Sequence, residues 1–281
     1  MRVLVTGCGG MVGQAVREEC ELHGDEVRSY DHDSLDISNS DLVRVTLERD
    51  KPQAVINCAA WTDVDGCEGN PAQAHAANGL GPENLAAASR RVGAIFVTIS
   101  TDYVFDGDRA GFYTQRDDPN PQSVYAATKL NGERRAQLAC ARTIVVRSGF
   151  IFGPGGRNFL SVVGKRIRHG EKINAIGDAW GTPTYSRHLA ARLRELAQLD
   201  LPGIYHVVNS GDGATYEEFA RAVVEALGRD QSLVEAVRAD SLKRPAPRPR
   251  NSRLSCLLSE AVGLVPLPPW QDAVRHFVEF V

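Results

Sequence analysis

"RVLVTGCGGMVGQAVREECELHG" (residues 2–24) is the stretch that decides the fold. The run "RVLVT" is rich in β-branched residues and predicts a strand, while the apolar spacing of "MVGQAVREECELHG" predicts a helix. Between them, Gly7, Gly10 and Gly13 form G-x-x-G-x-x-G, which lets the backbone turn tightly and approach a ligand. This unit predicts a nucleotide-binding α/β fold, with the helix N-terminus facing a diphosphate.

Strands and helices continue to alternate after this unit. The predicted strands are 26–31, 53–60, 94–101 and 143–149, and the predicted helices are 40–50, 71–93 and 121–141. These strands are apolar almost throughout, which is typical of a parallel sheet covered by helices on both faces. The sequence therefore predicts an α/β protein with a Rossmann-like doubly wound parallel sheet, which binds ligands at the carboxyl ends of its strands.

Two acids follow the second predicted strand. Asp31 ends that strand, where a carboxylate can accept hydrogen bonds from an adenosine ribose and would repel a 2′-phosphate. This favours NADH over NADPH as the cofactor, although Arg28 and His32 beside it can soften the repulsion. Asp36 and Ile37 are a second candidate for the adenine edge.

Tyr125 and Lys129 form a Tyr-x-x-x-Lys pair on one face of the predicted helix 121–141. An adjacent ammonium favours the phenolate and is expected to lower the tyrosine pKa into the range useful for acid–base catalysis. Taken alone, such a pair arises more often by chance than for chemistry. Thr101 ends the fourth strand, where its hydroxyl can hold a substrate carbonyl oxygen. Together with the glycine turn, the three residues predict a proton-transfer site.

The pattern loosens after about residue 155. Helices are predicted at 158–170, 186–198 and 215–228, a strand at 203–208, and a proline-rich basic loop at 243–252. We therefore predict an NAD(P)-binding Rossmann-like domain over residues 1–155 and a smaller substrate-binding lobe over 156–281. That lobe is free to contribute elements back to the main sheet.

Composition excludes several classes of function. The chain has 281 residues, 43% hydrophobic and 24% charged, and its net charge of −3 provides no general basic field for nucleic acid. No apolar run is long enough to span a bilayer and no leader precedes the first strand, so we expect a cytoplasmic protein without membrane partners. The six cysteines and seven histidines are scattered, so we expect free thiols and no metal site.

A set of motifs spread over nearly the whole chain resembles the extended short-chain dehydrogenase/reductase family. These motifs are "VTGCGGMVGQ", "VINCAAWTDVDGCE", "STDYVFDG", "PNPQSVYAATKLNGE", "VVRSGFIFG", "NFL", "GTPT", "RPRNSRL" and "LPPWQDAV". Within that family the chain is most similar to the dTDP-4-dehydrorhamnose reductases, because "STDYVFDG", "GTPT" and the C-terminal motifs are the more specific ones.

The resemblance implies hydride transfer from NAD(P)H to the C4 ketone of a dTDP-4-keto-6-deoxy sugar, giving dTDP-L-rhamnose, in a chain that can form a homodimer. Tyr125 would donate the proton, Lys129 would activate it and bind the ribose, and Thr101 would bind the sugar carbonyl oxygen. The implied cofactor site is Gly7, Gly10, Met11, Val12, Gly13, Asp31, Asp36, Ile37, Ala59, Ala60, Thr62, Asn78, Tyr125 and Lys129. The implied substrate site is Thr101, Ser148, Phe150, Asn158 and Arg253.

Departures from the family pattern keep alternatives open. Phe150 stands where the family usually has Trp, and Trp61 where a smaller or imidazole side chain is frequent, so the identity of the sugar is open. An NAD-dependent nucleotide-sugar epimerase is one alternative, and a non-catalytic subunit like the β subunit of methionine adenosyltransferase is another. A sugar-nucleotide dehydratase is disfavoured, because Tyr103 stands where similar dehydratases have Glu after the Thr-Asp pair.

Overall fold

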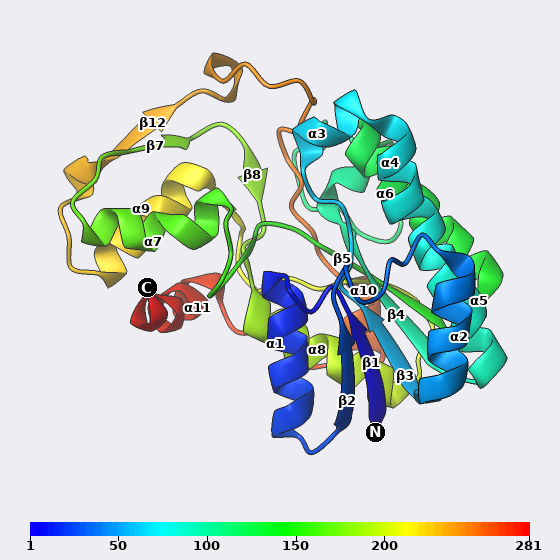
Figure 1. The fold of residues 1–281 in the computed structure, drawn as a ribbon. Helices are drawn as coiled ribbons and strands as arrows, with labels where there is room; N and C mark the ends of the chain where they lie inside the picture. Colours follow the sequence, from blue (N-terminus) through cyan, green and yellow to red (C-terminus); the bar gives the residue numbers. More distant parts are fainter.

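Six parallel strands form the central sheet of the computed structural model, which describes all 281 residues (Figure 1). Their order across the sheet is β10-β5-β4-β3-β1-β2. The strands are β1 (Arg2–Thr6), β2 (Glu26–Tyr30), β3 (Ala54–Asn57), β4 (Ile95–Thr101), β5 (Thr143–Ser148) and β10 (Gly203–His206). The prediction of a Rossmann-like parallel sheet is confirmed, because every neighbouring pair of these strands is parallel.

Helices cover both faces of this sheet, and strand alternation decides which side chains meet them. Val3 and Val5 of β1 pack with α1 (Met11–Leu22) and α8 (Ser186–Leu199) in one core. Leu4 points to the opposite face and packs in a second core. The helices that cover this second core are α2 (Ser40–Asp50), α5 (Gly81–Val92) and α6 (Val124–Ala139). The continuous apolar runs seen in the sequence are therefore strands buried on both sides.

The predicted helix 71–93 is interrupted in the structure. It consists of α4 (Pro71–His75), a wider π turn over Ala76–Leu80, and α5. Turns of this kind inside helices are frequent at functional sites. A short helix not predicted from the sequence, α3 (Val64–Gly69), precedes it and begins where the Asp63 carboxylate accepts the N–H of Gly66 at 3.0 Å. Both irregular segments lie on the side of the sheet that carries α6.

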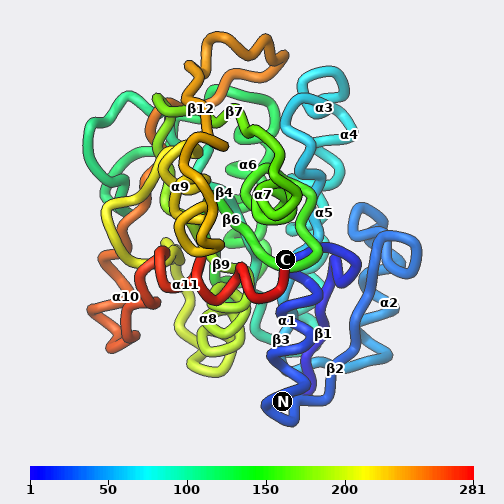
Figure 2. The backbone as a smooth tube through the Cα atoms, turned by 90° about the vertical axis from the view of Figure 1, so that its left-hand side faces the viewer, coloured from blue at the N-terminus to red at the C-terminus, as the bar shows by residue number.

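A second, smaller layer of helices and short strands has its own core; it lies at the upper left in Figure 1 and faces the viewer in Figure 2. Its helices are α7 (Phe159–Arg168), α9 (Tyr216–Ala226) and α11 (Trp270–Phe277). Its short strands are β6 (Ile151–Phe152), β7 (Ile173–Ile176), β8 (Trp180–Gly181), β9 (Thr184–Tyr185), β11 (Ala214–Thr215) and β12 (Val234–Val237). The sequence pattern predicted α7 and α9 but none of these six short strands.

Two elements from the second half of the chain return to the central sheet. β10 pairs in parallel with β5 at the edge of the sheet, and α8 packs against α1. The small helix α10 (Leu257–Ala261) lies beside β10. The division of the chain after residue 155 stays a prediction, and these contacts join its two parts through one shared core.

The structure has no membrane-spanning helix, no disulfide bond and no cluster of metal ligands. None of the helices combines the length and the apolar composition that crossing a membrane requires. All six cysteines are free thiols; Cys20, Cys67 and Cys140 are buried, and the other three are partly exposed. No group of three or more His, Cys, Asp or Glu side chains is arranged to hold a metal ion.

Leu193→Ala should destabilise the whole sheet, because Leu193 on α8 is fully buried in the core shared with β1. Removing a buried leucine side chain costs about 2–5 kcal/mol of unfolding free energy. Urea unfolding followed by far-UV circular dichroism measures the loss, with the half-exposed Leu199→Ala as the matched control. If the protein unfolded in two transitions and only one of them lost stability in Leu193→Ala, the shared core would be contradicted.

Candidate active site

The turn between β1 and α1 is packed too tightly for a side chain at two of its positions, Gly7 and Gly13. Gly7 has a φ of 70°, and a Cβ on it would lie 2.6 Å from the backbone nitrogen of Ala59. A Cβ on Gly13 would lie 2.1 Å from the carbonyl oxygen of Gly7. Gly10, which is exposed, donates its N–H to the same carbonyl at 3.0 Å just before α1 begins at Met11. The result is a glycine-lined cradle at a helix N-terminus, which suits a diphosphate.

The two residues between Gly10 and Gly13, at the start of α1, contact other parts of the protein. Val12 is half-buried and packs against the core of the central sheet. The Met11 sulfur accepts a hydrogen bond from the Ser161 hydroxyl on α7 at 3.5 Å. The start of α1, where a cofactor diphosphate is predicted, is therefore joined directly to the second layer of the molecule.

Two asparagines hold the loop that follows β3. Asn57, which the sequence analysis missed, accepts the Thr6 hydroxyl at 2.6 Å and donates to the Thr98 hydroxyl at 3.0 Å. Asn78 donates to the Trp61 carbonyl at 3.0 Å and accepts the Trp61 N–H at 2.9 Å. Asn78 was predicted to lie near the cofactor, and its amide is buried behind the loop. The loop contains three other residues predicted to contact the cofactor: Ala59, Ala60 and Thr62.

The two predicted ribose-side acids lie beyond β2, and local hydroxyls bind both. Asp31 accepts the N–H and the hydroxyl of Ser34 at 2.9 and 2.6 Å, and these bonds lower its pKa. Asp36 accepts the Ser38 hydroxyl at 2.7 Å, which likewise lowers its pKa. Of the two acids, Asp31 lies near the glycine turn: a Cβ added to Gly9 would be 3.9 Å from the Cβ of Asp31. Both acids are therefore carboxylates at neutral pH.

Two neighbours of these acids are directed elsewhere. Arg28 pairs with Glu26 at 3.5 Å, so its guanidinium is engaged along β2. Ile37 is buried, and a Cβ on Gly81 would lie 2.5 Å from its Cδ1. Asp31 therefore has no paired cation, and Arg28 does not neutralise its charge in this structure.

Thr101, Tyr125 and Lys129 are brought together at the carboxyl end of β4. Tyr125 and Lys129 lie one turn apart on α6, which Ser123 caps by accepting the N–H of Ala126. All three predicted residues are buried, and the Thr101 hydroxyl is close enough to the phenol to influence its pKa. The Lys129 ammonium donates to a backbone carbonyl of β4, that of Ile99, at 2.7 Å.

The expected lowering of the Tyr125 pKa is wrong for this structure. Burial raises the pKa of the Tyr125 phenol well above its usual value, and the nearby Thr101 hydroxyl opposes this only in part. Burial likewise lowers the pKa of Lys129 to about 8, against a usual 10.5. Loss of hydration outweighs charge pairing because the Lys129 ammonium is directed at the Ile99 carbonyl. Tyr125 is therefore a fully protonated acid.

Asp102 is a buried carboxyl group that the sequence analysis did not select. It follows Thr101, whose hydroxyl donates to its Oδ1 at 3.1 Å. A Cβ on Gly149 would lie 2.3 Å from the Asp102 carboxyl carbon, so the glycine makes room for it. Burial raises the Asp102 pKa to about 6, although the hydroxyls of Ser252 and Thr101 oppose the shift. The acid in "STDYVFDG" was a usable signal, because its position next to Thr101 puts it at the same strand end.

A buried ion pair supports the site from behind. The Arg147 Nη2 on β5 lies 2.7 Å from the Glu133 Oε2 on α6, and both side chains are almost wholly buried. The hydroxyl of Ser100 on β4 also donates to Glu133. Removing one partner of such a pair is costly, because the other charge is left without compensation. The pair therefore fixes α6 against β4 and β5, one helical turn from Lys129.

The predicted substrate residues Ser148 and Phe150 lie beside Thr101. Ser148 ends β5 directly opposite Thr101 in the parallel register. Phe150 has a φ of 45°, and its ring lies 4.5 Å from that of Tyr216. A Cβ on Gly181, the first residue of "GTPT", would lie 2.3 Å from the Phe150 ring, so only glycine leaves room for that ring. The structure thus brings these two predicted residues to the strand ends that carry Thr101.

Asn158 and Arg253 make mainly structural contacts. Asn158 caps α7, accepting the Ser161 N–H at 2.9 Å. The Arg253 guanidinium lies between the rings of Phe112 and Trp180, 5.2 and 5.1 Å from their centroids. Its groups also donate to the Asn251 side chain and to two backbone carbonyls. Their predicted contact with the substrate stays a prediction.

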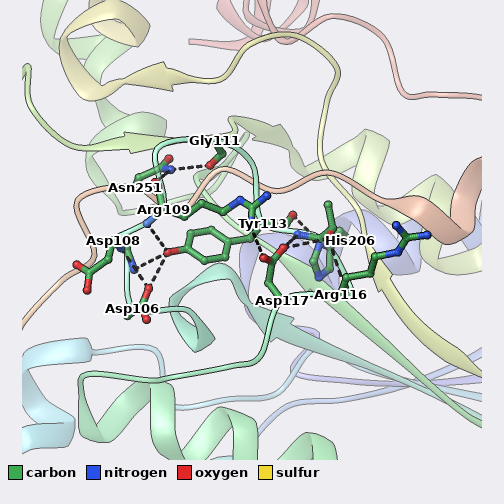
Figure 3. Close-up of polar contacts among 11 residues, drawn as sticks. Asp106, Asp108, Arg109, Gly111, Tyr113, Arg116, Asp117, His206 and Asn251 are labelled. Carbon is green, nitrogen blue, oxygen red and sulfur yellow. Dashed lines mark hydrogen bonds and ion pairs between the residues drawn. The ribbon is translucent and has the colours of Figure 1, made fainter.

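The loop after "STDYV" is folded around one tyrosine (Figure 3). The Tyr113 hydroxyl donates to Asp106 at 2.7 Å and accepts the N–H of Arg109 at 3.1 Å. The Asn251 amide donates to the carbonyl of Gly111 at 2.7 Å. The loop is thereby fixed against the C-terminal segment that contains Asn251, so residues distant in the sequence are held together there.

Comparison with known proteins gives a consistent result. The family model described as "RmlD substrate binding domain" matches residues 1–281. A dTDP-4-dehydrorhamnose reductase of Streptomyces griseus is 37% identical over 281 residues, covering 98% of this chain and 92% of the relative.

Solved structures agree with these sequence matches. The dTDP-4-dehydrorhamnose reductase of Bacillus anthracis, in complex with NADP, superposes with a TM-score of 0.95 at 31% identity, covering 100% of this chain and 99% of that one. A UDP-glucose 4-epimerase of Thermus thermophilus, in complex with NAD, superposes with a TM-score of 0.85 at 25% identity, covering 100% and 98%.

Asp102→Asn should raise the unfolding free energy at neutral pH. The folded chain holds the Asp102 proton with a pKa of about 6, against an ordinary 3.8, so stability from this group is lost as pH rises through that interval. The ionised carboxyl then costs about 3 kcal/mol, which the amide avoids. Urea unfolding of both proteins from about pH 4 to pH 7 measures the difference, which should grow with pH. The exposed Asp41→Asn is the control; an unchanged difference across this range would refute the buried-acid assignment.

Proposed function

This chain belongs to the family described as the RmlD substrate binding domain, and on that premise we propose that it reduces the C4 ketone of a dTDP-4-keto-6-deoxy sugar with NAD(P)H, giving dTDP-L-rhamnose. The observation that carries this proposal is the meeting of Thr101, Tyr125 and Lys129 at one strand end. The glycine cradle lies at the same edge of the sheet. A proton donor and a cofactor cradle are therefore adjacent.

The cradle supports the binding of a dinucleotide. Gly7 and Gly13 leave no room for side chains, so ligand oxygens can approach the backbone and the start of α1. Asp31 lies beside the turn as an ionised acceptor for ribose hydroxyls. When bound, the dihydronicotinamide supplies the hydride.

The chain's own groups would handle the substrate oxygen. Thr101 and Tyr125 would hold the ketone oxygen between two hydroxyls, which favours the negative charge that develops on it. Because the Tyr125 pKa is raised, the phenol carries its proton until that oxygen becomes basic enough to take it. The Lys129 ammonium, near the phenol on the same helix face, would then stabilise the phenolate and bind the nicotinamide ribose.

A nucleotide-sugar epimerase is the second candidate, favoured by the similarity to the Thermus thermophilus UDP-glucose 4-epimerase. An epimerase keeps its cofactor through turnover, so it produces no net oxidation of NAD(P)H. The sugar nucleotide would instead change its stereochemistry at constant absorbance.

One assay separates these readings. The purified protein is mixed with the dTDP-4-keto sugar and with NADH or NADPH, and absorbance is followed at about 340 nm, where reduced nicotinamide absorbs. We expect stoichiometric loss of absorbance and formation of dTDP-L-rhamnose. Isomerised sugar at constant absorbance would support the epimerase, and no conversion at all would point to a non-catalytic subunit.

Tyr125→Phe should lower kcat by roughly 10²- to 10⁴-fold and leave cofactor affinity nearly unchanged. The phenyl ring can still pack against Tyr103, whose ring lies 6.3 Å away, while the proton donor is lost. Steady-state kinetics and fluorescence titration with NADPH give the two readouts. Tyr205→Phe is the matched control, since its hydroxyl bonds only the Leu201 carbonyl. A Tyr125→Phe enzyme with normal turnover would rule out the proposed role.

Asp31→Ala should improve kcat/KM for NADPH more than for NADH, because it removes a carboxylate that repels a 2′-phosphate. The measurement is the ratio of kcat/KM with the two cofactors. Asp36→Ala is the matched control, because this acid has a similar Ser hydroxyl partner farther along the chain. If Asp36→Ala rather than Asp31→Ala shifts the ratio, then the ribose-side acid is Asp36.

A further inference from the structure

The basic segment "KRPAPRPR" (residues 243–250), which we call the strap, bridges the two parts of the molecule. In Figure 1 the chain runs from the end of β12, over the top of the molecule, to the side of α3. The strap also packs on the "STDYVFDG" motif, because a Cβ on Gly107 would lie 2.6 Å from the Pro249 Cβ. A loop from the second half of the chain therefore closes over the segment that carries Thr101.

A single carboxylate fastens the strap to α3. The Asp65 oxygens Oδ1 and Oδ2 accept the Arg248 Nη1 and Nη2 groups, each at 2.8 Å. Oδ1 also accepts the N–H of Ala246 at 3.0 Å. The bidentate ion pair lowers the Asp65 pKa to about 2. At neutral pH Asp65 is thus a charged clasp between α3 and the strap.

The other end of the strap has a similar anchor within its own part of the chain. Asp178 accepts the Ala239 N–H at 2.7 Å and the Arg250 Nη1 at 2.6 Å. The backbone carbonyl of Arg250 also accepts the Trp180 N–H at 2.8 Å. Asp65 and Asp178 therefore use the same chemistry, but only Asp65 joins the strap across to the cofactor part.

The clasp lies over groups that belong to the proposed site. Burial raises the pKa of the Tyr103 and Tyr216 hydroxyls, and the Arg248 guanidinium is close enough to both for its charge to oppose this rise. The Asp102 charge acts on both hydroxyls as well. The Tyr103 ring packs edge-on to Tyr125, with centroids 6.3 Å apart. Arg248 is thus a cation close to Tyr103, the residue that packs against the proton donor.

We propose that Asp65 is a positioning residue that holds the Arg248 guanidinium beside the site. The diphosphate of the sugar nucleotide would then replace the Asp65 carboxylate as the partner of that guanidinium. The proposal rests on the proposed function for the identity of the ligand. An arginine fork binds a carboxylate and a phosphate with the same bidentate geometry, and a diphosphate brings more negative charge than one carboxylate. The Asp65 side chain keeps about a third of its surface exposed, so the exchange can take place in contact with solvent.

Asp65→Asn removes the negative charge of the side chain and keeps its shape. The amide oxygen can still accept the N–H of Ala246 and one Arg248 N–H, so the strap keeps its position. A neutral amide competes less well for the guanidinium than a carboxylate does. The diphosphate then meets a free arginine, and its affinity should rise.

The experiment is calorimetric titration of dTDP into the wild type, Asp65→Asn and Asp178→Asn. We expect Asp65→Asn to bind dTDP about three- to tenfold more tightly than the wild type, because one partly exposed ion pair no longer competes with the ligand. This gain in affinity should disappear at high salt, which screens the charges. Asp178→Asn, the matched control, should bind like the wild type. In an Arg248→Met background the Asp65→Asn change should have no effect.

Other outcomes would overturn the inference. Weaker binding by Asp65→Asn would mean that the carboxylate only supports the strap, and equal binding would mean that Arg248 does not exchange partners. Equal gains in both Asn variants would indicate a general charge effect. If the wild type turns over and binds dTDP while Asp65→Asn is unchanged, the inference alone fails; no dTDP binding by any variant contradicts the proposed function as well.

Discussion

The close approach of the β1–α1 turn to the chain after β3 is the constraint on which the rest depends. The hypothetical Cβ contacts at Gly7 and Gly13 fall at 2.6 and 2.1 Å, so backbone lies against backbone with no side chain between. Asn57, at the end of β3, completes this contact by joining the end of β1 to the middle of β4 through the hydroxyls of Thr6 and Thr98. The cofactor edge of the sheet is therefore a rigid surface, and Thr101 at the end of β4 inherits its position from it.

Burial, more than charge pairing, sets the protonation states at this edge. Tyr125, Asp102 and Lys129 are almost wholly covered, and each has its pKa shifted toward the neutral form. In the buried ion pair nearby, the negative charge of Glu133 and the positive charge of Arg147 neutralise each other. A polar ligand that enters such a site meets groups that have already lost water, so their interactions with it are stronger than at an open surface.

Local sequence patterns were sufficient for the sheet and for the meeting of Thr101, Tyr125 and Lys129. Apolar runs and glycine spacing are short-range signals, and parallel topology brings strand ends together without further information. The raised pKa of Asp102 and the burial of Asn78 were not predictable in this way, because both depend on packing against distant parts of the chain, such as Gly149 at Asp102 and Thr128 at Asn78. The Asp65–Arg248 pair joins residues more than 180 positions apart, and no periodicity encodes such a contact.

The position of β10 has a consequence for how the chain assembles. β5 is complete by Ser148, yet its outer edge is covered only when Gly203–His206 pair with it. During synthesis, that edge and the apolar face awaiting α8 stay uncovered while some fifty further residues emerge from the ribosome. An unpaired strand edge invites association with other chains, and long-range pairing is slow. The second half of this protein is thus needed first as a cover for the nascent sheet.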